Sequence, residues 1–192
     1  MKKLLCALLT AFMVACATAT PQQKLGDAFQ LLQENRPIPA EALMRQAMDE
    51  FKAQGSEYDL GVAQFMYGQF VRSRHFTWEF FRSYYPNTET QEQRNAMART
   101  YFLAARESFR KALASPQLAL DQRTGYFWRE YLTNLELGDQ PAICSSLRSM
   151  KESNEAYEAA SPGAKVNVPG GFRTFGEFVQ DALSKAQCSS SK

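Results

Sequence analysis

Apolar residues recur at three- and four-residue intervals along nearly the whole of this 192-residue chain. That spacing is the period of an amphipathic α-helix, whereas a strand alternates every second residue. No segment longer than a few residues alternates in the way a strand does. The pattern predicts an all-α fold of about six to eight helices. A clear stripe is formed by Leu43, Met44, Ala47, Met48 and Phe51.

Prolines and glycines divide this pattern into helices. Pro39 is expected to open a helix that Gly55 ends, and Ser56 with Asp59 is expected to cap the next one. Because the connection is short, we expect these two helices to form an antiparallel hairpin. A second hairpin is expected from helices near 98–113 and 122–137. Further helices are expected after Pro141 and after Thr174, the first residue of a capping box.

The N-terminus has the three parts of an export signal. Lys2 and Lys3 precede an apolar stretch over 4–15, which is too short to span a bilayer. Met13-Val-Ala-Cys16 resembles the lipobox of bacterial lipoproteins, so residues 1–15 are interpreted as a signal peptide and Cys16 as the lipidated residue. Ala17 is not the aspartate that retains such proteins in the inner membrane. The resemblance therefore implies the periplasmic face of the outer membrane. Cleavage after 17–19 would instead give a soluble periplasmic protein.

Cysteine usage agrees with export. Once the signal is removed and Cys16 is lipidated, only Cys144 and Cys188 remain. An isolated pair in an oxidising compartment usually bonds, so we expect a disulfide; two unpaired buried thiols are the alternative. His75 is the only histidine, which leaves too few ligands for a metal site.

Composition predicts one domain and excludes a general nucleic-acid binder. Without Lys2 and Lys3 the chain holds 20 basic and 20 acidic residues, whereas such binders are strongly basic. We expect a tether over 16–23, a single helical domain over 24–188 and a disordered tail over 189–192.

Part of the helical region is similar to tetratricopeptide repeats. Ala105, Phe109, Ala112 and Pro116 have nearly the small-aromatic-small-proline spacing of the second helix of such a repeat. Tyr67-Gly68 followed by Val71 is similar to the first helix. The resemblance covers about 39–160 and implies a short array of stacked hairpins, each of which buries the apolar face of its neighbour. A non-repetitive helical bundle is the alternative.

An aromatic segment over 75–85 is the main candidate for binding a partner. Aromatic side chains often anchor interfaces because they desolvate a large area with few rotatable bonds. The alternative is that these rings fill the seam between the hairpins. The candidates are His75, Phe76, Trp78, Phe81, Tyr84 and Tyr85, together with Tyr126 and Trp128 in a later helix.

The sequence gives no catalytic residue and implies no cofactor. Glu107-Ser108 resembles the glutamate-serine pair of lytic transglycosylases, but the downstream motif of that family is absent. Glu107 is better explained as a surface glutamate ion-paired with Arg110 or Lys111. No glycine-flanked serine suits a hydrolase.

Two functions follow from these observations. The first is a membrane-anchored, non-catalytic scaffold or accessory factor that holds a protein or peptide partner in an envelope assembly or secretion machine. The second is an immunity or inhibitor lipoprotein that neutralises a toxin or a cell-wall hydrolase. A scaffold predicts a concave groove, whereas an inhibitor predicts a convex wedge.

Overall fold

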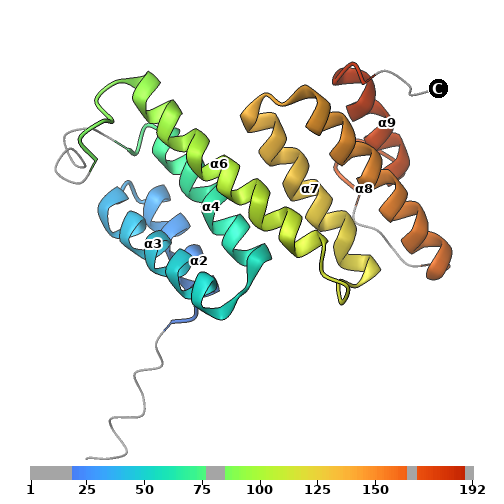
Figure 1. Cartoon of the computed structure of the whole chain (residues 1–192), viewed down its shortest axis with the longest axis horizontal. Helices are drawn as coiled ribbons and strands as arrows, with labels where there is room; N and C mark the ends of the chain where they lie inside the picture. Colours follow the sequence, from blue (N-terminus) through green and yellow to red (C-terminus); the bar gives the residue numbers. More distant parts are fainter. Residues whose placement is uncertain (1–18, 77–84, 164–167, 189–192) are drawn as a thin grey trace, which may run out of the picture.

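The computed structural model describes residues 19–76, 85–163 and 168–188. All the regular structure in these residues is α-helical, as the sequence predicts (Figure 1). The helices, in chain order, are α2 (Pro21–Gln33), α3 (Pro37–Gln54), α4 (Glu57–Arg72), α6 (Gln91–Leu113), α7 (Leu120–Leu137), α8 (Gln140–Ala160) and α9 (Phe175–Lys185).

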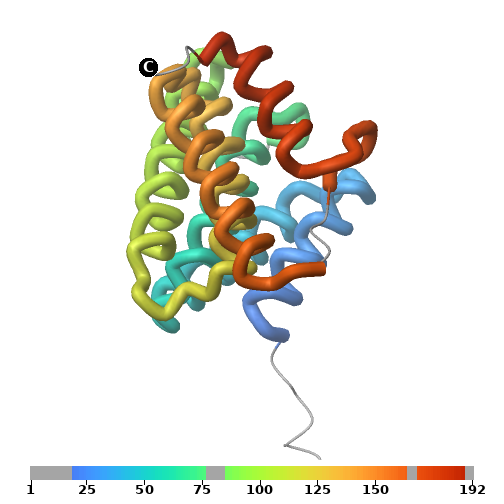
Figure 2. The backbone as a smooth tube through the Cα atoms, turned by 90° about the vertical axis from the view of Figure 1, so that its right-hand side faces the viewer, coloured from blue at the N-terminus to red at the C-terminus, as the bar shows by residue number. Residues whose placement is uncertain are grey.

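The helices stack in series rather than around one centre. The α2–α3 pair lies at one end, α4 and α6 occupy the middle, and α7, α8 and α9 follow (Figures 1 and 2). Each element packs mainly on the next elements along the chain. The first and last elements of the stack therefore have packing neighbours on one side only.

Side-chain caps set the starts of α2, α6, α8 and α9. Thr20 accepts a hydrogen bond from the backbone N–H of Gln23, whose side chain accepts one from the N–H of Thr20. This capping box starts the first helix at Pro21, so the expected start at Lys24 was wrong. The next helix likewise starts at Pro37 rather than at Pro39.

Two glycines end helices as the sequence predicts. Gly55 and Gly138 adopt left-handed backbone conformations, with φ of 68° and 65°. Such conformations are strained for residues that carry a Cβ. The side chain of Ser56 does not cap the next helix as expected. Its hydroxyl donates to the carboxylate of Asp59 instead of accepting a hydrogen bond from a backbone N–H.

The helices pair differently from the hairpins expected from connection length. The most extensive packing joins α2 with α3, α4 with α6, and α7 with α8; α3–α4 and α6–α7 contacts are smaller. Gly61 and Gly68 explain the central pair. An ideal Cβ on either would lie 2.7 Å from a ring carbon of Phe109 or Phe102 on α6. The rings of α6 thus occupy the space that the missing side chains leave.

Two hydrophobic cores result. The larger lies among α2, α3, α4 and α6 and includes Phe51, Tyr67 and Phe102. The smaller lies among α7, α8 and α9, where Leu147, Met150 and Val179 are fully buried.

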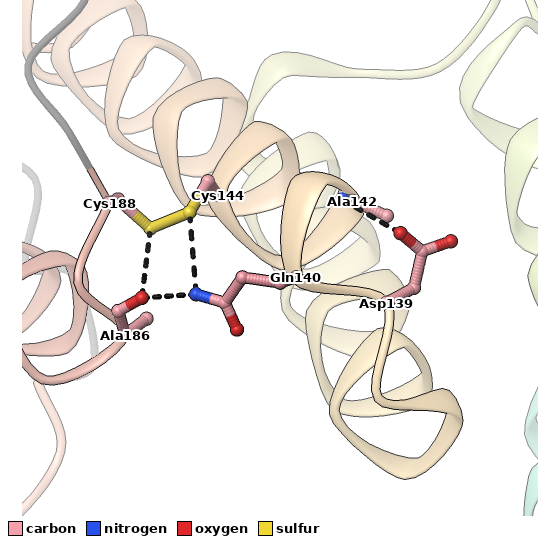
Figure 3. The surroundings of a disulfide bond; sticks show 6 residues. All are labelled: Asp139, Gln140, Ala142, Cys144, Ala186 and Cys188. Carbon is pink, nitrogen blue, oxygen red and sulfur yellow. Dashed lines mark hydrogen bonds between the residues drawn. A yellow bond between two sulfur atoms is a disulfide. The ribbon is translucent and has the colours of Figure 1, made fainter.

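The Cys144–Cys188 disulfide, expected from the cysteine count, holds the end of the chain against α8. The two Cα atoms are 5.5 Å apart and 44 positions separate the residues in sequence. Figure 3 shows Gln140 beside the bond, where its amide donates to the carbonyl oxygen of Ala186. The region after α9 is therefore held by both a covalent bond and a hydrogen bond.

Candidate partner-binding cleft

A cleft of about 880 Å³ lies between α2 and α4. Its volume is in the upper part of the range of ligand pockets, roughly 300 to 1,000 Å³. Met44 of α3 and Phe70 of α4 are buried at its base, whereas Phe29 of α2 is 55% exposed. The apolar lining is completed by Leu32 and Met66. The polar lining consists of Gln33, Asn35, Gln69, Ser73, Arg74 and His75.

The cleft opens at one end of the stack. Gln33 and Asn35 lie at the end of α2, and Ser73, Arg74 and His75 directly follow α4. Because α3 reverses the chain between them, α2 and α4 run in the same direction and both end at the cleft (Figure 1). The chain enters α2 at the opposite end.

The sequence-predicted residue His75 lines this cleft. Its Nδ1 atom is buried without a hydrogen-bond partner, which is costly unless a ligand or water pairs with it. Its neighbour Arg74 is exposed and makes no ion pair among the residues that the structure describes. Arg74 is therefore an exposed side chain on the rim and is open to an acidic partner.

The two binding candidates Phe76 and Tyr85 pack against each other. Phe76 is only 2% exposed and packs edge-on against Phe70, so it belongs to the core. It is therefore not exposed to a partner, although the sequence made it a binding candidate. The ring of Tyr85 lies 5.5 Å from that of Phe76. Tyr85 is thus held against Phe76, which directly follows His75.

A partly buried polar network holds Tyr85 in this position. Glu41 Oε1 accepts from the hydroxyls of Tyr67, at 2.7 Å, and of Tyr85, at 2.5 Å, and Arg45 donates to the Tyr85 hydroxyl at 2.8 Å. Burial raises the pKa of Tyr67 above its ordinary value, and its bond to Tyr85 and the charge of Glu41 add to the shift. Burial also raises the pKa of Tyr101, whose ring packs on Tyr67. The network therefore positions the chain and keeps its tyrosines protonated at neutral pH.

Tyr126 and Trp128 lie away from the cleft. Tyr126 stacks on Tyr58 of α4 with ring centroids 3.9 Å apart. Trp128 packs against Phe178 of α9 within the smaller core. Both residues pack against a neighbouring helix and remain partly exposed, so their role in binding stays a prediction.

Four other predictions fall on residues outside those described. They are the lipidated Cys16 and the aromatic candidates Trp78, Phe81 and Tyr84.

Sequence reasoning missed Phe29, Gln33, Asn35 and Arg74 as cleft residues. Phe29 was assigned to the first apolar stripe, and its exposure depends on the separation of α2 from α4. A surplus of apolar residues in that short helix was the only signal available.

Ser108 and Arg110 make structural contacts within the described residues. Within them, no group of three or more histidines, cysteines or carboxylates could hold a metal ion. Ser108 is buried and donates to Gln64 of α4. Arg110 pairs with Glu130 rather than with Glu107. Over the same residues, none of the helices has the length and apolar character needed to cross a membrane.

Comparison with known proteins gave no match to a family model, a curated protein or a solved structure.

Proposed function

We propose that this chain is a lipid-anchored periplasmic adaptor that holds a segment of an envelope protein in the α2–α4 cleft. It acts by binding and not by catalysis. The lipobox-like residues at its start support the anchor, and the stacked helical hairpins are consistent with the proposed likeness to tetratricopeptide proteins.

The observation that carries this proposal is the exposed apolar wall of the cleft. Phe29 is more than half exposed beside the buried Met44 and Phe70. Ligand sites are typically concave and lined mainly by apolar and aromatic side chains, as this cleft is.

The position of the cleft suits an anchored adaptor. The helix cap Thr20 lies only four positions after Cys16, a span of at most about 14 Å when extended. The thirteen residues of α2 then place the cleft about 20 Å further from the tether. A lipidated Cys16 would therefore be attached near the end of α2 that lies opposite to the cleft.

Site-specific photo-crosslinking in the envelope tests the proposal. A photoreactive phenylalanine analogue at position 29 is expected to capture a defined envelope protein, identified by mass spectrometry. The same analogue at Leu103, an exposed apolar residue of α6, is the matched control and should not capture it. Equal capture from both positions, or none from position 29, would refute the adaptor.

The anchor is tested separately. Cys16→Ser is expected to move the protein from the membrane fraction to the soluble periplasm. Mass spectrometry of the wild-type protein should then show acyl chains on Cys16. An unmodified first residue would contradict the anchor but not the cleft.

The alternative of an immunity or inhibitor lipoprotein makes a different prediction in the crosslinking experiment. It predicts one tightly bound toxin or hydrolase in equal amount, captured from outside the cleft. Crosslinks confined to position 29 would exclude it.

A further inference from the structure

The chemistry of the α2–α4 cleft selects one kind of partner segment. We propose that the cleft binds a peptide segment in which a bulky apolar side chain is flanked by an aspartate or glutamate. This inference rests on the proposed function, since it specifies the segment that the same cleft holds.

The base of the cleft fits the apolar side chain. Met44 and Met66 lie with Phe70 beneath the exposed ring of Phe29. Methionine side chains are flexible and polarizable, so they adapt to aromatic or branched side chains of different shape. A leucine, phenylalanine or tryptophan entering here would bury apolar surface on both molecules.

The rim fits a carboxylate. Arg74 and His75 line the cleft, and none of the residues that line it is acidic. Arg74 is exposed and makes no ion pair among the described residues, and the buried Nδ1 of His75 lacks a partner. A carboxylate beside the apolar side chain would accept hydrogen bonds from the exposed guanidinium of Arg74.

The remaining polar lining favours a peptide over an acyl chain. The side chains of Gln33 and Asn35 lie on the rim, and neither makes a hydrogen bond within the described part of the chain. An amide both donates and accepts, which matches the N–H and C=O groups of a peptide backbone. An acyl chain has no polar group along its length that could bond to these amides.

Selection from a random peptide library tests the proposal directly. A phage-displayed dodecapeptide library, fused through its C-terminus, is panned on the full protein carrying Cys16→Ser. The expected sequences combine an aromatic residue or leucine with a neighbouring aspartate or glutamate. Enriched peptides are then synthesised with a C-terminal amide and measured by fluorescence anisotropy, so that binding depends on the acidic side chain and not on a free terminus.

Matched variants locate the site. Phe29→Ala is expected to weaken binding about tenfold or more through lost apolar contact. Arg74→Glu is expected to weaken it about three- to tenfold, and Arg74→Lys to retain most of it. The controls are Leu103→Ala and Lys111→Glu on the exposed surface of α6. The first truncates an exposed apolar side chain, as Phe29→Ala does, and the second reverses a positive charge, as Arg74→Glu does. Neither control should change binding, and circular dichroism checks that every variant is folded.

Several results would overturn the proposal. These are a library that yields no binder, binders without acidic residues, or equal binding by wild type and Phe29→Ala. Saturable binding of cis-parinaric acid that Phe29→Ala abolishes would instead identify a lipid site. If crosslinking from position 29 still captures an envelope protein, the adaptor function stands and only the acidic-apolar specificity fails.

Discussion

Gly68 should not tolerate a methyl group, although it lies inside a helix. Alanine is favoured over glycine in a helix interior by about 0.8 to 1 kcal/mol. The built Cβ at Gly68, however, lies 2.7 Å from Cε1 and 3.0 Å from Cδ1 of Phe102. Carbon atoms normally approach to about 3.5 to 4.0 Å, so the ring would have to move by roughly 1 Å.

The Phe102 ring has little room to make that movement. It is 2% exposed, the ring of Phe65 lies 5.6 Å from it, and the guanidinium of Arg72 covers its face at 5.3 Å. Overpacking in such a site typically costs about 1 to 3 kcal/mol. After the gain in helix propensity, we expect Gly68→Ala to be destabilising by about 0 to 2 kcal/mol.

A matched glycine separates the two effects. Gly26 lies within α2, is exposed, and has no atom within 4 Å of an ideal Cβ. Gly26→Ala should therefore stabilise the protein by about 0.5 to 1 kcal/mol. The expected difference between the two variants is about 1 to 3 kcal/mol, measured by urea unfolding of the Cys16→Ser protein followed by circular dichroism.

A double-mutant cycle tests the cause. Phe102→Leu removes the outer ring atoms that the new Cβ would meet, so Gly68→Ala should become neutral or stabilising in that background. The coupling should be favourable by about 1 to 2 kcal/mol. If Gly68→Ala stabilises the wild type as much as Gly26→Ala does, the close approach of α4 and α6 is not what this glycine provides.

Three further predictions concern stability. Cys144→Ser should remove about 4 kcal/mol on the chain-entropy model for a loop of this length, lowering the melting temperature, whereas an unchanged value would mean that the bond contributes nothing. The pKa of Tyr67 is raised in the fold, so the contribution of its protonated hydroxyl to the free energy of unfolding is complete below pH 10. As the pH rises above the pKa of the unfolded state, this contribution falls by about 1.4 kcal/mol per pH unit. Tyr67→Phe should therefore show a shallower alkaline loss of stability than wild type, and parallel curves would contradict this reasoning. The pKa of Asp139 is lowered by hydrogen bonds from the backbone of Ala142 and then from Arg106, so its contribution is present at neutral pH and lost in acid; Asp139→Asn should lower the melting temperature at pH 7 and match wild type near pH 2.

Local signals predicted the helices well. Gly55 and Gly138 end helices because they can adopt left-handed conformations, and Thr174 caps α9 by accepting from the N–H of Glu177. These effects involve residues close in sequence, so they can be predicted without knowing the fold. The start at Pro21 was missed because the capping box of Thr20 and Gln23 was not recognised.

Helix pairing was harder to predict because it depends on surface shape. Connection length favoured pairing α3 with α4, but the glycine-lined side of α4 packs more extensively on the rings of α6. The spacing of Gly61 and Gly68 matches that of Phe102 and Phe109, seven positions in each case. That correspondence is present in the sequence, but it becomes informative only when the two helices are known to be neighbours.

The cleft could be predicted least. It exists because α2 and α4 stand apart over the side chain of Met44, and such a separation leaves no periodic pattern. The Glu41 network likewise joins residues 26 and 44 positions apart. Sequence reasoning placed His75 among the candidates through its aromatic neighbours, not through the geometry that now places it in the cleft.

The contact between Phe76 and Tyr85 has an evolutionary consequence. Phe76 directly follows the cleft residue His75, and Tyr85 donates a hydrogen bond to Glu41 of α3. Because the rings of Phe76 and Tyr85 pack together, a substitution at either ring would disturb the cleft and the Glu41 network at once. The two positions are therefore expected to change together between lineages.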